Sequence, residues 1–152
     1  MRGGSGPARR ISASDAPSHS TGAKKRVLFV CIGNSCRSPM AEALARAYGS
    51  DVLEARSAGL APATIIAPLT KQMLAERNIS AEDLFPKSLD VLREESFDVV
   101  VNLSGFPIPV TAPRQLVWPV PDPIGQSASV YREVAARLEK LVMGLILELR
   151  AG

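Results

Sequence analysis

Residues 27–43 read VLFVCIGNSCRSPMAEA and contain the pattern that decides the fold. The apolar run 27–30 is typical of a strand that is buried on both faces of a parallel sheet. A short loop with Gly33 follows, and Pro39 stands where a helix accepts a residue without an N–H. We expect Ser38 to be the N-cap of that helix. In such a unit the backbone N–H groups of the loop converge at the positive end of the helix dipole, which predicts an anion site.

Two reactive side chains stand at the ends of this loop, with five residues between Cys31 and Arg37. A thiol at a helix N-terminus beside a guanidinium is stabilised as the thiolate. The planar fork of Arg37 can hold two oxygens of a tetrahedral oxyanion, which a lysine cannot do. A thiolate below a bound phosphate is in place for in-line attack on phosphorus. The loop therefore predicts a nucleophilic site, although a buried structural cysteine and a surface arginine are the plainer interpretation.

A second chemical element is the sequence VPDPIG at residues 120–125. Prolines on both sides of Asp122 restrict its backbone and hold its side chain in one direction. A carboxylic acid above a cleft can give a proton to the leaving oxygen of a phosphate ester. Asp-Pro is also common in ordinary turns. The dipeptide therefore indicates a general acid only in combination with the loop that starts at Cys31.

Together these motifs resemble the signature of the low-molecular-weight protein tyrosine phosphatase superfamily, which also contains arsenate reductases and protein-arginine phosphatases. The similarity runs from about residue 25 to 149 and includes the sequence SAG at residues 57–59. The resemblance implies that Cys31 is the nucleophile, that Arg37 clamps the phosphate, and that Asp122 is the general acid and later the base.

The resemblance also implies roles for the rest of the loop, and it implies neither a cofactor nor a metal. The substrate oxyanion would be bound by Ile32, Gly33, Asn34, Ser35, Cys36 and Ser38. Ser57 would join Asn34 in a network that stiffens the loop, whereas the plainer interpretation is a hydroxyl at a strand end. Cys36 is either a small buried residue or the partner that traps an oxidised Cys31 as a disulfide, as in the tyrosine phosphatases.

The composition fits an enzyme of this kind and excludes some other classes. A chain of 152 residues predicts one main domain. Six of the first 26 residues are lysine or arginine, so the pI of about 9.1 does not indicate nucleic-acid binding by the remainder. Two cysteines in one loop indicate a reducing cytoplasm, and the longest apolar runs are too short for a membrane span. We expect a cytoplasmic protein whose partners are neither nucleic acids nor membranes.

The chain divides into a basic tail at 1–24, expected to be disordered, and a phosphatase domain at 25–152. His19 is the only histidine and falls in the tail, which argues against a histidine triad or zinc site in the domain. Alternation of strands and helices predicts an α/β fold. We expect a three-layer, doubly wound parallel sheet of about four strands, with helices on both faces and the phosphate loop after the first strand. Expected strands are 27–30, 52–57, 97–103 and 116–120, and expected helices are 39–48, 68–77, 88–95 and 127–149.

The hypotheses about function differ in the substrate that the site would accept. We favour a phosphatase for phosphotyrosine-type monoesters, which takes a phosphorylated protein or a small aryl phosphate. Tyrosine phosphatases often line the cleft with aromatic residues, whereas this chain has Leu60, Ile65, Ile66 and Ile124 in those regions. The polar Ser35 keeps a protein-arginine phosphatase open as an alternative.

An arsenate reductase is the other alternative, because residues 97–100 and the surroundings of Trp118 are similar to that branch. That branch places further cysteines at and after the end of the 97–103 strand, where this chain has Leu103-Ser104-Gly105 and no third cysteine. A reductase would therefore need an external thiol or a glutaredoxin-like partner. A binder of phosphorylated ligands without catalysis is the remaining hypothesis, and it is disfavoured because Cys31, Arg37 and Asp122 are all present.

Overall fold

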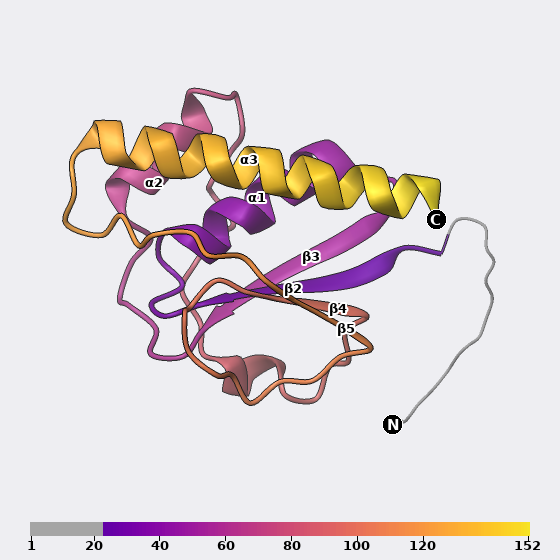
Figure 1. Cartoon of the computed structure of the whole chain (residues 1–152). Coiled ribbons are helices and arrows are strands. Elements are labelled where there is room, and N and C mark those ends of the chain that lie inside the picture. Colours follow the sequence, from indigo (N-terminus) through magenta and orange to yellow (C-terminus); the bar gives the residue numbers. More distant parts are fainter. Residues whose placement is uncertain (1–22) are drawn as a thin grey trace.

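Four parallel strands form the sheet of the computed structural model, which describes residues 23–152 (Figure 1). In chain order they are β2 (Lys25–Cys31), β3 (Leu53–Gly59), β4 (Val99–Asn102) and β5 (Arg114–Val117). Their spatial order is β3-β2-β4-β5, and every neighbouring pair is parallel. The predicted tail, with His19, lies outside the described residues except for its last two positions.

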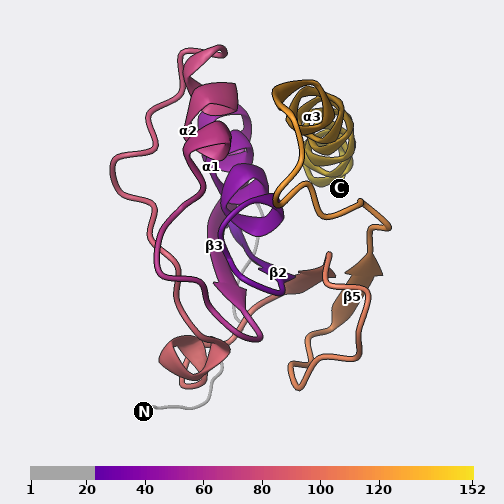
Figure 2. The same cartoon turned by 90° about the vertical axis from the view of Figure 1, so that its left-hand side faces the viewer.

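Helices cover the two faces of this sheet unequally. Figure 2 shows α1 (Arg37–Gly49), α2 (Pro68–Ala75) and α3 (Ala128–Ala151) together on one face. The opposite face is covered by the single-turn 3-10 helix η1 (Leu89–Leu92) and by loop residues between β4 and β5. The α/β class, the parallel four-stranded sheet and the phosphate loop after its first strand are confirmed.

The apolar run of β2 is explained by burial on both faces. Val27 and Phe29 pack in the cluster under the α-helices, and Leu28 and Val30 pack in the cluster under η1. All four side chains are at most 1% exposed. Because successive side chains of a strand point to opposite faces, only a continuous apolar run can fill both clusters.

The strand order places the site. The chain leaves β2 through α1 and returns to β3 on one side, whereas β4 lies on the other side of β2. The carboxyl end of β2 is therefore a point where the direction of winding reverses, and open α/β sheets bind ligands in such crevices. Cys31 is the last residue of β2 and lies at this point.

The start of α1 corrects one prediction. Ser38 is not the N-cap, because the helix begins at Arg37 and Cys36 is its N-cap. Met40 donates the first intrahelical hydrogen bond, 3.1 Å to the carbonyl of Cys36. Pro39 therefore occupies the last position whose N–H has no partner in the helix, which a proline tolerates. The hydroxyl of Ser38 makes other contacts, described below.

Other boundaries differ by a few residues. The last strand is Arg114–Val117 and not 116–120, because Pro119 and Pro121 lack the N–H groups that a strand ladder needs. The strand predicted at 97–103 is shorter and covers Val99–Asn102, and the helix predicted at 88–95 is reduced to the 3-10 turn η1.

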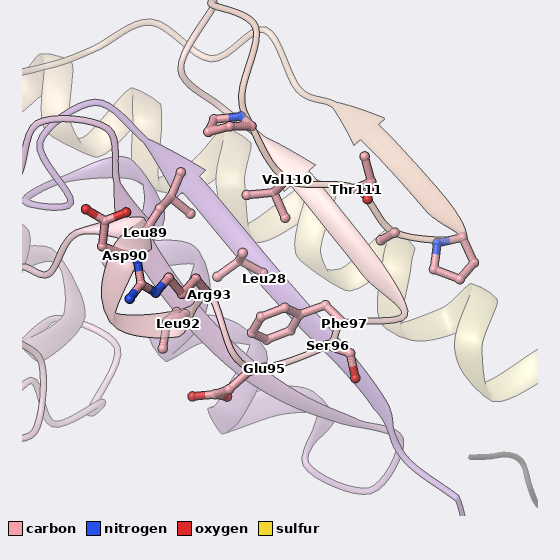
Figure 3. Close-up of a pocket in the computed structure, with 13 residues that line it drawn as sticks. Leu28, Leu89, Asp90, Leu92, Arg93, Glu95, Ser96, Phe97, Val110 and Thr111 are labelled. Atoms are coloured by element: carbon pink, nitrogen blue, oxygen red, sulfur yellow. The ribbon is translucent and has the colours of Figure 1, made fainter. Parts of the chain in front are cut away.

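A hollow of about 710 Å³ lies on the face of the sheet opposite the α-helices (Figure 3). Leu28 and Phe97 belong to its apolar lining, between η1 and the loop segment 109–113. It shares no lining residue with the smaller cavity at Cys31 described below. Among the described residues, no helix is both long enough and apolar enough to cross a membrane.

Candidate active site

A cavity of about 180 Å³ opens at the carboxyl end of β2. It brings together the three residues predicted to do the chemistry, although Asp122 is 91 positions away from Cys31 in the sequence. Its lining residues are Cys31, Ile32, Gly33, Ser35, Cys36, Arg37, Ala63, Asp122 and Ile124. Two residues of the predicted loop, Asn34 and Ser38, are fully buried and are absent from this lining.

Cys31 lies at the base of this cavity and is 2% exposed. Its Sγ is 2.8 Å from the Oγ of Ser38, which is on the first turn of α1. The Nδ2 of Asn34 donates to the same Oγ over 2.9 Å. Because the oxygen of Ser38 accepts from Asn34, its hydroxyl hydrogen is available for the sulfur.

Asn34 shapes the loop from within. Its φ of 50° is in the left-handed region, which asparagine adopts more easily than most residues. Its Nδ2 also donates to the Oγ of Ser57 over 2.9 Å, and its Oδ1 accepts from the backbone N–H of Lys87 over 2.9 Å. The bond between Asn34 and Ser57 joins the two residues that the resemblance connected. It stays a prediction that this network stiffens the loop.

Glu42 extends this network and was not among the predicted site residues. It is 2% exposed, accepts a hydrogen bond from Ser57 and forms an ion pair with Arg46. A buried carboxylate is costly unless it is paired and hydrogen-bonded, and both conditions are met here. The signal was present in the sequence, since Glu42 and Arg46 are four residues apart in the helix.

Gly59 lets the end of β3 touch the loop. A Cβ atom at this position would lie 2.6 Å from the carbonyl oxygen of Ile32 and 2.9 Å from the backbone nitrogen of Asn34. No side chain fits between these backbones. The glycine of the predicted SAG motif is therefore required by close packing against the loop.

The guanidinium of Arg37 is held by two backbone carbonyls. Its Nη1 donates to the carbonyl oxygen of Leu103 over 2.6 Å and to that of Val120 over 3.0 Å. Arg37 is 5% exposed, and its Nε has no hydrogen-bond partner within residues 23–152. The Nε–Nη2 edge of a guanidinium is the one that binds two oxygens side by side, and the bonds to the carbonyls of Leu103 and Val120 do not use it.

Asp122 lies at the mouth of the cavity. Its side chain is 38% exposed, and its Oδ2 is 3.6 Å from the Nη2 of Arg37. The backbone N–H of Ile124 donates to its Oδ1 over 3.2 Å. The carboxyl group therefore contacts both solvent and the guanidinium.

Cys36 faces away from solvent and toward α3. Its Sγ is 3.3 Å from the hydroxyl of Tyr131, and both residues are at most 4% exposed. Burial raises the pKa of the Cys36 thiol, against a smaller lowering of that pKa by the Tyr131 hydrogen bond. Sequence reasoning missed Tyr131, because no local pattern connects it with a residue 95 positions earlier.

The loop is also tied to the segment before α2. Ser35 donates from its Oγ to the carbonyl of Ile65 over 2.9 Å, and the hydroxyl of Thr70 donates to the carbonyl of Ser35 over 3.0 Å. Ile65 itself is 60% exposed beside the site. The polar Ser35 is therefore used inside the protein as a loop anchor.

Comparisons with known proteins give a consistent assignment. A family model described as "Low molecular weight phosphotyrosine protein phosphatase" matches residues 26–108. The "Glutaredoxin arsenate reductase" of Synechocystis sp. is 32% identical over 127 residues, which are 80% of this chain and 96% of that protein. The solved structure of an arsenate reductase in the phosphate binding state has a TM-score of 0.76 at 32% identity, and the match covers 82% of this chain and 98% of that one.

The low molecular weight protein tyrosine phosphatase of T. tengcongensis has a TM-score of 0.71 at 30% identity, and the match covers 82% of this chain and 99% of that one. The chain belongs to the low molecular weight phosphotyrosine protein phosphatase family.

Proposed function

We propose that the protein is a cysteine-dependent phosphatase that hydrolyses phosphotyrosine-type monoesters through a phosphocysteine intermediate. The observation that supports this most is the buried guanidinium of Arg37, whose Nε has no partner within the described residues. A buried donor left unpaired costs about 1–3 kcal/mol. A tetrahedral oxyanion would satisfy this donor and would lie beside the sulfur of Cys31, because both residues line one cavity.

The reaction has two steps. The Cys31 thiolate attacks phosphorus, the P–O bond to the leaving group breaks, and Asp122 gives its proton to the departing oxygen. Asp122, now a carboxylate, then takes a proton from a water molecule that attacks the phosphocysteine. The S–P bond breaks, the thiolate is regenerated and inorganic phosphate leaves. The Ser38 hydroxyl, 2.8 Å from the sulfur, supports the thiolate in both steps.

The walls of the cavity support an ester with an apolar leaving group. Ile32, Ala63 and Ile124 contribute apolar side chains around the polar base, and Ile124 is 54% exposed at the mouth. An aryl ring fits such an aliphatic wall by burial of apolar surface, without aromatic stacking. Each group that the hydrolysis needs, apart from water, belongs to this chain.

Arsenate reduction is the second candidate function, and the names of the similar proteins favour it. Cys31 would displace a hydroxide from arsenate and form an S–As bond. An external thiol would then attack the Cys31 sulfur, which releases arsenite and leaves a mixed disulfide, and a second thiol would reduce that disulfide. Arsenic gains two electrons and the two thiols lose two. The chain has only two cysteines, so the two external thiols must come from a low-molecular-weight thiol or from a glutaredoxin-like protein.

Parallel assays separate the two functions. We expect the parent protein to release phosphate from phosphotyrosine and p-nitrophenyl phosphate, and Cys31→Ser to lose this activity. Gln115→Ala is a matched control, because Gln115 is exposed on β5 and does not line the cavity. Parent-level turnover in Cys31→Ser would refute the mechanism. Arsenite formation with a thiol, together with the absence of phosphate release from either ester, would replace the proposed function by the reductase.

A further inference from the structure

The turn that follows β4 is closed by side-chain hydrogen bonds. The Oδ1 of Asn102 accepts from the backbone N–H of Ser104 over 2.9 Å and from its hydroxyl over 2.7 Å. The Nδ2 of Asn102 donates across the turn to the carbonyl of Phe106 over 2.7 Å. The Oγ of Ser104 accepts from the N–H of Phe106 over 3.0 Å, and Gly105 provides a φ of 82°. The turn 102–106 therefore has a side-chain lock, formed by Asn102 and Ser104.

This lock surrounds the carbonyl that holds Arg37. Leu103, between Asn102 and Ser104, donates its N–H to the carbonyl of Val30 over 2.7 Å and accepts from the Nη1 of Arg37 over 2.6 Å. The peptide unit that carries the Leu103 carbonyl ends at the nitrogen of Ser104, and that N–H is bound to Asn102. Leu103 is 1% and Ser104 is 4% exposed. The side chain of Asn102 thus restrains the peptide unit that carries the Leu103 carbonyl.

The other carbonyl on Arg37 is fixed in a different way. Val120 lies between Pro119 and Pro121, so its backbone is restricted by its neighbours. Two acceptors on a single nitrogen, Nη1, restrict the plane of the guanidinium and leave its Nε–Nη2 edge free of these two bonds. If the Leu103 carbonyl rotates, one of these acceptors is lost and the plane can tilt.

We propose that Asn102 is a positioning residue for oxyanion binding, acting through the Leu103 carbonyl on the guanidinium of Arg37, with Ser104 as its partner. This inference rests on one part of the proposed function, namely that Arg37 binds the oxyanion. It does not depend on the hydrolysis.

Calorimetric titration with inorganic phosphate tests this role directly. The dissociation constant reports the geometry of the site in folded molecules, whereas the stoichiometry reports the fraction that is folded. For Asn102→Ala and Ser104→Ala we expect the dissociation constant to rise about tenfold, since a small misplacement of a binding group has effects of this order or larger. The value of kcat/KM for p-nitrophenyl phosphate should fall by a similar factor. Gln115→Ala, an amide on the neighbouring strand, is the control.

The outcomes are distinct. A rise of about threefold or more relative to Gln115→Ala, in either variant that folds, supports the positioning role. A smaller change overturns it, even if the stoichiometry falls, because a purely structural role lowers only the folded fraction. A parent protein that binds phosphate but hydrolyses no aryl phosphate would refute the proposed function and would leave this titration interpretable.

Discussion

The sulfur of Cys31 lies 2.8 Å from the hydroxyl oxygen of Ser38, and that oxygen also accepts a hydrogen bond from Asn34. The residue expected to cap helix α1 thus has its side chain turned back to the end of β2. A thiolate can only accept a hydrogen bond, so the hydroxyl is the donor whenever the sulfur is ionised. In the proposed mechanism a helix N-terminus and an O–H donor would then both lie beside the negative charge of the thiolate.

Removal of this hydroxyl should slow the reaction. A hydrogen bond to a charged group contributes about 1.5–3 kcal/mol. We therefore expect Ser38→Ala to lower kcat/KM by about ten- to a hundredfold and to slow alkylation of Cys31 by iodoacetate. Ser129→Ala, an exposed serine on α3, is the matched control. Equal rates in the two variants would show that the hydroxyl does not support the thiolate.

Asp122→Asn should affect substrates according to their leaving group. An asparagine cannot give up a proton, so kcat should fall by about a hundredfold or more for phosphotyrosine, whose leaving group needs one. An ester of a strongly acidic phenol, such as dinitrophenyl phosphate, should lose much less in the first step. Rapid-quench measurement of the first turnover checks this contrast. A uniform loss for both esters would contradict a general-acid role.

The local part of the site could be predicted from the sequence, and the part that depends on distant backbone could not. The strand, the loop and helix α1 are contiguous, so the spacing of Cys31 and Arg37 predicted a shared site for the two side chains, and both line one cavity. The acceptors of Arg37 are carbonyls of Leu103 and Val120, 66 and 83 positions away, and any residue type supplies a carbonyl. The Cys36–Tyr131 contact escaped prediction for a related reason, since it depends on how α3 packs.

The fold shows the same division. Periodicity predicted the long helices to within a few residues, because one face of each meets an apolar cluster. It misplaced β5, since Leu116 to Val120 is apolar enough for a strand, whereas the strand ends at Val117 and only the N–H of Trp118 makes one further bond to β4. It also gave no indication that η1 is only one turn long.

Gly59→Ala should damage the site specifically. The added methyl group would meet backbone atoms of Ile32 and Asn34 at less than 3 Å, so the loop must shift. We expect a loss of about 1–3 kcal/mol in the free energy of unfolding and a large fall in kcat/KM. Gly144→Ala is the control, because nothing lies within 4 Å of its Cβ position in α3. That variant should gain about 0.5–1 kcal/mol and keep its activity, and a similar gain for Gly59→Ala would contradict the packing argument.

The pKa of Cys36 predicts a loss of stability in alkaline solution. Its folded pKa is raised above the reference value of 9.0, chiefly by burial. The stability that this thiol contributes is complete below pH 9.0 and is lost as the pH rises through the raised pKa. Tyr48 and Tyr131 have pKa values raised in the same direction, so some slope will remain without the thiol. Denaturant titrations on both sides of pH 9.0 should therefore show a shallower decline in Cys36→Ala than in the parent, and identical declines would contradict the assignment.

The most direct test of the account is to look for the phosphoryl group on sulfur. Asp122→Ala keeps Cys31 and Arg37 but lacks the base that activates water, so it should accumulate the intermediate when mixed with dinitrophenyl phosphate and quenched. We expect mass spectrometry of the quenched protein to find one phosphoryl group, on Cys31, and none in the Cys31→Ser, Asp122→Ala double variant. A phosphoryl group on another residue, or none while phosphate is still released, would contradict nucleophilic attack by Cys31.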